Sequence, residues 1–137
     1  MESVIVDTGF VVALVNRADH RHSDVLPVYL QHRLILMPQF VLVEVAYLIG
    51  RDAGILTVVE FLRGLPASRF ELIAATDQDI TRTASLIEQY ADSKVDFVDA
   101  SIIAIAERLK IQTVLTIDQR DFRMVRPRHC ESFTLLP

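Results

Sequence analysis

The stretch "SVIVDTGFVVALVN" (residues 3–16) decides the fold class. Its first four residues form a short apolar run rich in β-branched side chains, which is typical of a buried strand. The apolar run that starts at Gly9 predicts a helix, with Thr8 as its cap. Asp7 stands between the two, so we expect a strand that ends at an acid and leads directly into a helix.

The same alternation of strand and helix patterns continues to the end of the chain. Further strands are expected at residues 34–37, 70–73, 113–117 and near 132–136. Helices are expected at residues 23–32, 38–50, 55–65, 76–92 and 97–109. The first of these would have Ser23 as its cap and Pro27 in its first turn, and Thr76 and Asp79 predict a capping box. Alternating strands and helices favour an α/β fold with a parallel sheet covered on both faces.

Composition limits the possible classes of protein. A chain of 137 residues without repeats or linkers is the size of one domain. Cys130 is the only cysteine, so neither an intrachain disulfide nor a cysteine-based zinc site can form. The net charge of -4 argues against a protein that coats nucleic acid by bulk electrostatics, but not against an enzyme that grips it locally.

The most apolar segment, residues 34–50, is just short of a membrane span and is interrupted by Pro38, Gln39 and Glu44. It therefore predicts a buried strand followed by a buried helix. The start of the chain carries acid where a signal peptide carries base. We expect a cytoplasmic protein with no membrane partner.

Two acids directly follow predicted strands, Asp7 after residues 3–6 and Asp118 after residues 113–117. In open α/β sheets, ligands bind outside the carboxyl ends of the strands, and parallel strands bring both acids to the same edge. The alternative is that each acid serves only a turn or cap, where its side chain bonds nearby backbone N–H groups.

Glu44 lies among apolar residues of the predicted helix 38–50. A lone carboxylate in such surroundings is unfavourable to desolvate, so it must reach an opening, pair with a cation or hold a proton. The alternative to a functional role is an ion pair with Arg51, seven residues further along the same helix.

The segment "VDFVDASIIAIAERL" (residues 95–109) carries Asp96 and Asp99 at the start of a helix. Asp96 is the natural cap, and Asp99 would complete an acidic capping box. The body of the helix is apolar nearly all round, which predicts that it is buried and that its first turn faces the edge of the protein. Capping and cation binding are both open for Asp99.

These acids would form one cluster at the sheet edge. Its members are Asp7, Glu44, Asp99 and Asp118, with Asp96 and Asp121 near it. Clustered carboxylates repel one another, and a divalent cation removes that repulsion. Because the ligands would all be oxygen atoms, Mg²⁺ or Mn²⁺ is favoured over Zn²⁺.

Four pieces of the sequence, in this order, carry a family resemblance: "VDTGF", "VLVEVAYL", "DFVDASIIAIAERL" and "VLTIDQRDF". The chain resembles a PIN-domain ribonuclease, most of all the VapC toxins of bacterial and archaeal toxin–antitoxin pairs. The resemblance covers nearly the whole chain. It implies a single PIN-like nuclease domain over residues 1–137, with a three-layer fold and a mainly parallel sheet of four to five strands flanked by helices.

The resemblance also implies roles for individual residues. Asp7 and Asp99 would be the principal metal-binding acids, Glu44 and Asp118 the other catalytic acids, and Thr8, Asp96 and Thr116 accessory residues. The implied activity is Mg²⁺-dependent, with Mn²⁺ as a substitute, and hydrolyses phosphodiester bonds in RNA. The family often has Ser after "DT", where this chain has Gly9, so a side-chain contact from that position is not carried over.

The implied partners are the RNA substrate, a cognate antitoxin whose C-terminal segment lies across the active-site groove, and a second copy of the chain. Arg120 and Arg123 follow the last acidic strand, and guanidinium groups match phosphate geometry, so they would grip RNA. The alternative for this segment is a solvated loop with surface ion pairs.

Three rival functions use similar residues. A receiver-like Mg²⁺-binding signalling domain pairs adjacent acids after its first strand and has a lysine after a late strand, but Asp7 is followed by Thr8 and neither Lys94 nor Lys110 is so placed. A phosphatase of the haloacid dehalogenase class requires an acid at position 9, which is Gly9. A PIN-fold module that binds RNA or a partner without cleaving would not need all four acids.

Overall fold

The computed structural model describes residues 2–137 and is built around a five-stranded parallel sheet. The strand order is β3-β2-β1-β4-β5, and every neighbouring pair is parallel. The strands are β1 (Val4–Val6), β2 (Ile35–Pro38), β3 (Phe70–Ile73), β4 (Thr113–Leu115) and β5 (Thr134–Leu136). This confirms the predicted α/β class and all five predicted strands, although β4 and β5 are each two residues shorter than expected, β1 is one residue shorter and β2 is shifted by one residue.

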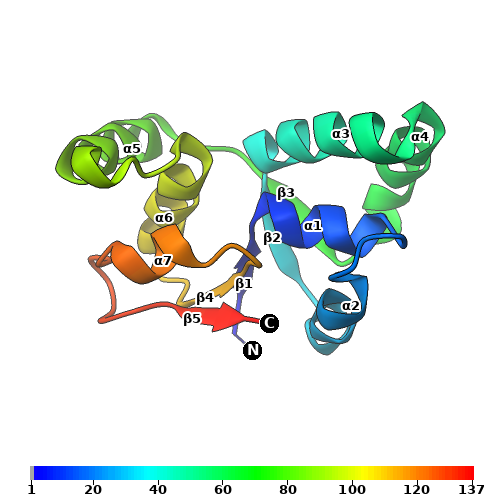
Figure 1. Ribbon diagram of the computed structural model, residues 1–137. Helices are drawn as coiled ribbons and strands as arrows, with labels where there is room; N and C mark the ends of the chain where they lie inside the picture. The colour runs from blue at the N-terminus through cyan, green and yellow to red at the C-terminus, as the bar shows by residue number, and fades with distance from the viewer. Residues whose placement is uncertain (1) are drawn as a thin grey trace.

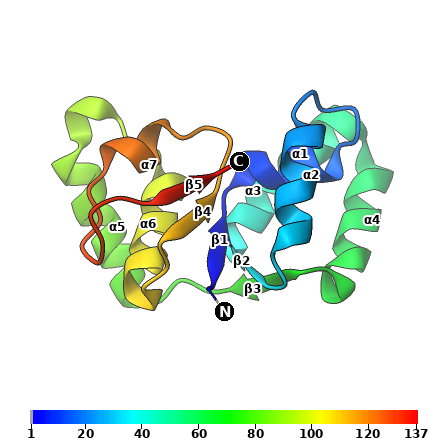
Figure 2. The same cartoon turned by 90° about the horizontal axis from the view of Figure 1, so that it is seen from below.

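The helices form two groups on either side of the sheet (Figures 1 and 2). The first group is α1 (Thr8–Val15), α2 (His22–Gln31), α3 (Gln39–Ala53) and α4 (Ile55–Gly64), with the 3-10 helix η1 (Leu65–Ala67). The second is α5 (Asp77–Gln89), α6 (Phe97–Leu109) and α7 (Arg120–Met124), with the 3-10 helix η2 (Ala91–Ser93). The chain winds outward from β1 to β3 and then returns to place β4 on the other side of β1. The switch point between β1 and β4 is where such sheets bind ligands.

The core lies along the central strands and α6. β1 and β4 are buried along their whole length. In α6, every residue from Ala100 to Glu107 is buried, as its apolar sequence predicts. This burial fixes α6 beside β1, and so it fixes the position of the helix start that carries Asp96 and Asp99.

Two predicted helix starts are wrong in detail. Asp7, not Thr8, is the N-cap of α1, because the Asp7 carboxylate accepts the Thr8 N–H at 2.7 Å. α2 begins at His22, so Ser23 lies inside the helix and Arg21 is its N-cap, without a side-chain hydrogen bond. Pro27 therefore lies beyond the first turn. Pro27 has no N–H to donate to the carbonyl of Ser23, four residues earlier. Ser23 is exposed, so water can donate to this carbonyl instead.

Other boundaries follow the local sequence signals. Thr76 and Asp79 make the predicted capping box at the start of α5. α3 runs past Gly50 to Ala53, and Gly54, with φ +96, separates it from α4 in a conformation that favours glycine. The segment after β4 is a short helix, α7, rather than a loop. None of the helices within residues 2–137 is long and apolar enough to cross a membrane.

Candidate active site

The carboxyl ends of β1 and β4 meet at one edge of the sheet. The Asp7 N–H donates to the carbonyl of Leu115 at 2.9 Å, which continues the strand pairing by one residue. The Thr116 hydroxyl lies 3.0 Å from Asp7 Oδ2 and 3.0 Å from the carbonyl oxygen of Asp118, and it can donate to either. The sheet thus places Asp7, Thr116 and the backbone of Asp118 together, as the strand positions predict.

Asp7 is a buried carboxylate with 7% of its surface exposed. Burial raises its pKa to about 6, against the lowering effect of hydrogen bonds from the Thr8 N–H and the Thr116 hydroxyl. The negative charges of Glu44 and Asp96 raise the pKa further, which shows that both acids lie near Asp7.

Asp96 and Asp99 have different tasks at the start of α6. Asp96 is the N-cap, and its Oδ2 accepts the N–H groups of Val98 at 3.0 Å and Asp99 at 3.3 Å. The pKa of Asp99 is raised to about 10, first by burial, then by the charge of Asp7 and by a hydrogen bond with Asp121. Asp99 therefore faces other carboxylates and holds a proton at neutral pH when no cation neutralises them.

Asp121 is the site neighbour whose contacts sequence patterns do not predict. It is 6% exposed, and its Oδ2 accepts the Asp96 N–H at 3.2 Å. Its Oδ1 accepts from Arg120 Nη1 at 2.8 Å. The sequence signal for this role is weak: an acid followed by the buried Phe122, in a segment long enough for one helical turn.

Glu44 lies near the cluster, but it is less buried than its sequence surroundings predict. α3 buries Val41, Val45 and Ile49 and leaves Val43 and Tyr47 70% and 68% exposed, so Glu44 sits half-buried at the border of the two faces. The suggested ion pair with Arg51 is wrong, because the Arg51 guanidinium pairs with Asp52 at 2.7 Å.

Asp118 stands apart from the other predicted acids. Its side chain is exposed, and Oδ1 accepts only a long, 3.4 Å bond from the Arg120 N–H. Within residues 2–137, no hydrogen bond joins its carboxylate to Asp7 or Asp99. Arg120 and Arg123 are also engaged by the protein, since Arg120 Nη2 donates to the Ser93 carbonyl and Arg123 Nη2 to Gln119 Oε1, both at 2.6 Å.

The donor set suits a hard divalent cation. The carboxylates of Asp7 and Asp99 supply only oxygen, and the buried Thr8 hydroxyl beside Asp7 has no hydrogen-bonding partner among the described residues. No three Asp, Glu, His or Cys side chains between residues 2 and 137 converge closely enough to enclose a metal ion. Mg²⁺ needs no such cage, because it usually keeps several waters and binds one or two carboxylates plus phosphate oxygens.

Comparison with known proteins decides the family. The family model of the PIN domain matches residues 4–126. The chain belongs to the PIN-domain family. All the acids described above lie inside the matched range. The receiver-like signalling domain considered as a rival is therefore a different family from that of this chain.

The proteins to which this chain is similar include a ribonuclease and, at the level of the fold, two solved structures. Ribonuclease VapC26 of Mycobacterium tuberculosis is 27% identical over 135 residues, which cover 98% of this chain and 100% of the relative. The crystal structure of Mycobacterium tuberculosis VapC20, described as a sarcin-ricin loop cleaving toxin, superposes with a TM-score of 0.77 at 22% identity, over 85% of this chain and 90% of that one. DNA-bound VapBC from Salmonella typhimurium gives a TM-score of 0.71 at 17% identity, over 98% and 97%.

Proposed function

We propose that this PIN domain is a Mg²⁺-dependent endoribonuclease and the toxin of a VapBC-type toxin–antitoxin pair. The observation that carries the proposal is that Asp7, Glu44 and Asp99, from three separate elements, lie near enough at the carboxyl edge of the sheet for the charge of Glu44 to act on Asp7 and that of Asp7 on Asp99. The full-length similarity to Ribonuclease VapC26 supports RNA as the substrate. Such an activity would take place in the cytoplasm, where we expect the protein.

Asp7 and Asp99 would hold the cation, with Mn²⁺ able to replace Mg²⁺. When bound, the cation supplies positive charge beside the scissile phosphate and makes water a stronger nucleophile. Asp99 must release its proton to bind the cation, so cation binding competes with protonation of Asp7 and Asp99.

The protein residues orient the site and accept the proton. The Thr8 N–H and the Thr116 hydroxyl fix the two oxygens of Asp7. Glu44 accepts no hydrogen bond from the described residues, so its carboxylate oxygens are free to take a proton from the attacking water. Asp118, exposed at the same edge, would meet the substrate from the solvent side.

Cleavage of RNA tests the proposal directly. The purified, antitoxin-free protein is incubated with RNA and Mg²⁺ beside the Asp7→Asn and Asp99→Asn variants. We expect cleavage by the wild type that requires the cation and is lost in both variants. RNA binding without cleavage would instead favour the PIN-fold binding module, and equal cleavage by all three proteins would place the nuclease outside this site.

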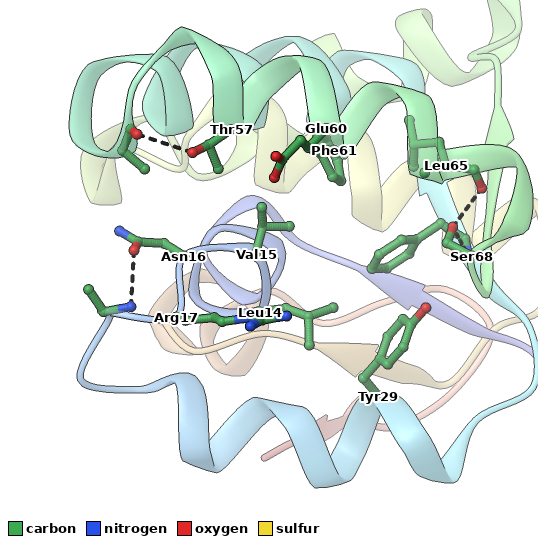
Figure 3. A pocket seen from close by; sticks show the side chains of 14 residues that line it. Leu14, Val15, Asn16, Arg17, Tyr29, Thr57, Glu60, Phe61, Leu65 and Ser68 are labelled. Carbon is green, nitrogen blue, oxygen red and sulfur yellow. Dashed lines mark hydrogen bonds between the residues drawn. The ribbon is translucent and has the colours of Figure 1, made fainter.

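The antitoxin partner has a suitable surface in a largely apolar hollow of about 670 Å³ between α1, α2 and α4, which is also lined by the charged residues Arg17 and Glu60. Figure 3 shows Glu60 and Phe61 of α4 across this hollow from Leu14 and Tyr29. We propose that an amphipathic segment of the antitoxin occupies it, with a basic residue beside Glu60. Glu60→Lys should weaken the toxin–antitoxin complex in a binding titration, whereas Glu88→Lys, an exposed control on α5, should not.

A homodimer is the second proposed assembly. Val43 and Tyr47 of α3 and Ile55 and Leu56 of α4 are large apolar side chains that are between 68% and 74% exposed. Large apolar side chains that are this exposed are suited to burial against a second copy of the chain. Light scattering of the purified protein should give twice the mass of one chain, and a monomer at micromolar concentration would contradict the proposal.

A further inference from the structure

Two helices of this PIN domain begin with an acid at the same position, three residues after the N-cap. In α5 the N-cap is Thr76 and the acid is Asp79; in α6 they are Asp96 and Asp99. The Asp79 carboxylate turns back and accepts the Thr76 N–H at 2.9 Å, which completes a capping box. The equivalent N–H of Asp96 donates to Asp121 instead.

The N–H of an N-cap residue needs an acceptor, since an unsatisfied backbone donor is unfavourable wherever the chain is shielded from water. Asp99 is the nearest acid along the chain and has the spacing to serve. Asp121, which is 25 residues from Asp96 in the sequence, occupies that place with its Oδ2 at 3.2 Å. Asp121 of α7 therefore accepts the Asp96 N–H, which Asp99 of α6 would accept in a capping box.

Asp121 is itself held in place. Its Oδ1 accepts from Arg120 Nη1 at 2.8 Å, and Arg120 Nη2 donates to the carbonyl of Ser93 at 2.6 Å. Ser93 ends η2, just before the segment that leads into α6. The pair of Arg120 and Asp121 therefore joins α7 to both ends of the short connection between η2 and α6.

We propose that Asp121 is a positioning residue: by accepting the Asp96 N–H in place of Asp99, it releases the Asp99 carboxylate to the acidic site. The inference rests on the proposed function, because it explains how Asp99 becomes available to a cation. Arg120 supports this arrangement by fixing the Asp121 carboxylate.

The carboxyl of Asp121 is also within hydrogen-bonding reach of that of Asp99, so a competing explanation is that Asp121 binds the cation itself. The two explanations differ in what they require of residue 121. Positioning requires an oxygen that accepts the Asp96 N–H, which asparagine retains. Direct cation binding depends on the negative charge, so asparagine, whose neutral oxygen is a much weaker ligand than a carboxylate, should lose affinity as alanine does.

The test uses two double variants, Arg120→Ala with Asp121→Asn and Arg120→Ala with Asp121→Ala. Removing Arg120 prevents its guanidinium from facing the amide NH₂ of the asparagine, so the asparagine can present its oxygen to the Asp96 N–H, whereas alanine has no acceptor at position 121. Mn²⁺ binding to each RNA-free protein is followed by electron paramagnetic resonance, with Arg120→Ala as the reference.

We expect the alanine protein to bind Mn²⁺ about 10- to 100-fold more weakly than Arg120→Ala, the range typical when a partner of a metal ligand is lost. The asparagine protein should stay within about threefold of the reference, since its acceptor remains. In RNA cleavage, kcat of the alanine protein should fall while KM for RNA stays that of Arg120→Ala. Equal loss of Mn²⁺ affinity in both double variants, or loss in neither, overturns the proposal.

A crystal structure of the alanine protein gives a readout that does not depend on metal or RNA. The Asp99 carboxylate should turn back to the Asp96 N–H, as Asp79 does in α5. An Asp99 that keeps its place overturns the proposal. If the alanine protein does not fold, the asparagine protein still decides, because a tenfold loss of Mn²⁺ affinity there contradicts positioning. A wild type that binds Mn²⁺ but leaves RNA intact would refute the nuclease function alone.

Discussion

Helix α5 has Thr76 as its N-cap with Asp79 three residues on, and helix α6 has Asp96 as its N-cap with Asp99 three residues on. The two helices pack against each other, yet their acids have opposite environments. Burial alone would raise the pKa of Asp79, but hydrogen bonds from Arg108 and the Thr76 N–H outweigh it and hold the pKa below its usual value. The pKa of Asp99 is raised to about 10, first by burial and then by the carboxyl groups of Asp7 and Asp121, which neighbour it where a guanidinium neighbours Asp79.

The difference between them comes from residues distant in sequence. Arg108, 29 residues beyond Asp79, forms a two-pronged ion pair with it at 2.9 Å. At α6, Asp7 and Asp121 approach Asp99 from other elements. At the third position of its helix, the Asp79 carboxylate therefore stabilises the fold. At the same position of α6, Asp99 lies in an environment that is unfavourable for a carboxylate, and a bound cation can relieve this. Such unneutralised acids mark functional sites.

The largest effect should follow from Asp99→Asn. RNA cleavage should fall by at least about a hundredfold, because charge stabilisation by a bound cation contributes several kcal/mol and each 1.4 kcal/mol is tenfold in rate. In metal-free buffer at pH 7 the same variant should melt at a higher temperature than the wild type, since it removes a carboxyl that disfavours the folded state. Cleavage assays and calorimetry on one preparation measure both. A lower melting temperature would show that Asp99 stabilises the fold after all.

Asp79→Ala should have the opposite effects: it should lower the stability of the fold and leave RNA cleavage unchanged. It removes a buried carboxylate from its ion pair with Arg108 and from the capping box of α5. Because the Arg108 side chain is 32% exposed and can turn to water, we expect a loss of about 2 to 3 kcal/mol of unfolding free energy, below the value for a fully buried pair. Urea unfolding measures it, and RNA cleavage below the melting temperature should be unchanged. A loss under about 0.5 kcal/mol would mean that the pair behaves like a surface ion pair.

Much of the fold could be predicted from local patterns, because the strands, the capping box of α5 and the burial of α6 each depend on residues that are close together in the sequence. The acid positions at the ends of β1 and β4 also follow from strand order. Other features depend on tertiary partners. The capping role of Asp121 requires α7 to pack against the start of α6, and the half-exposed position of Glu44 depends on which side of α3 meets the sheet. No spacing along the chain contains this information.

The smallest expected effect is the difference between Asp79 and Asp99 in how each contributes to the pH dependence of stability. Asp79 has a folded pKa below its ordinary value of 3.8, so its contribution is present above that value and is lost as the pH falls through the folded pKa. The free-energy difference between wild type and Asp79→Ala should therefore shrink as the pH is lowered below about 4. Asp99 has the opposite sign. Its folded pKa of about 10 lies above 3.8, so in metal-free buffer the advantage of Asp99→Asn should be absent below 3.8 and grow as the pH rises.

Urea unfolding of the three proteins between pH 3 and pH 8 measures both differences. Glu107, whose pKa is also lowered despite burial by its bonds with Arg82 and Arg128, titrates in the same acidic range. Because all three proteins contain Glu107, its effect cancels in the differences. A gap between wild type and Asp79→Ala that stays constant down to pH 3 would assign the stabilisation to packing rather than to charge. If the differences in unfolding free energy from wild type changed with pH in the same direction for both variants, Asp79 and Asp99 would have pKa values shifted in the same direction. The physical argument that Asp99 is available to bind a cation would then fail.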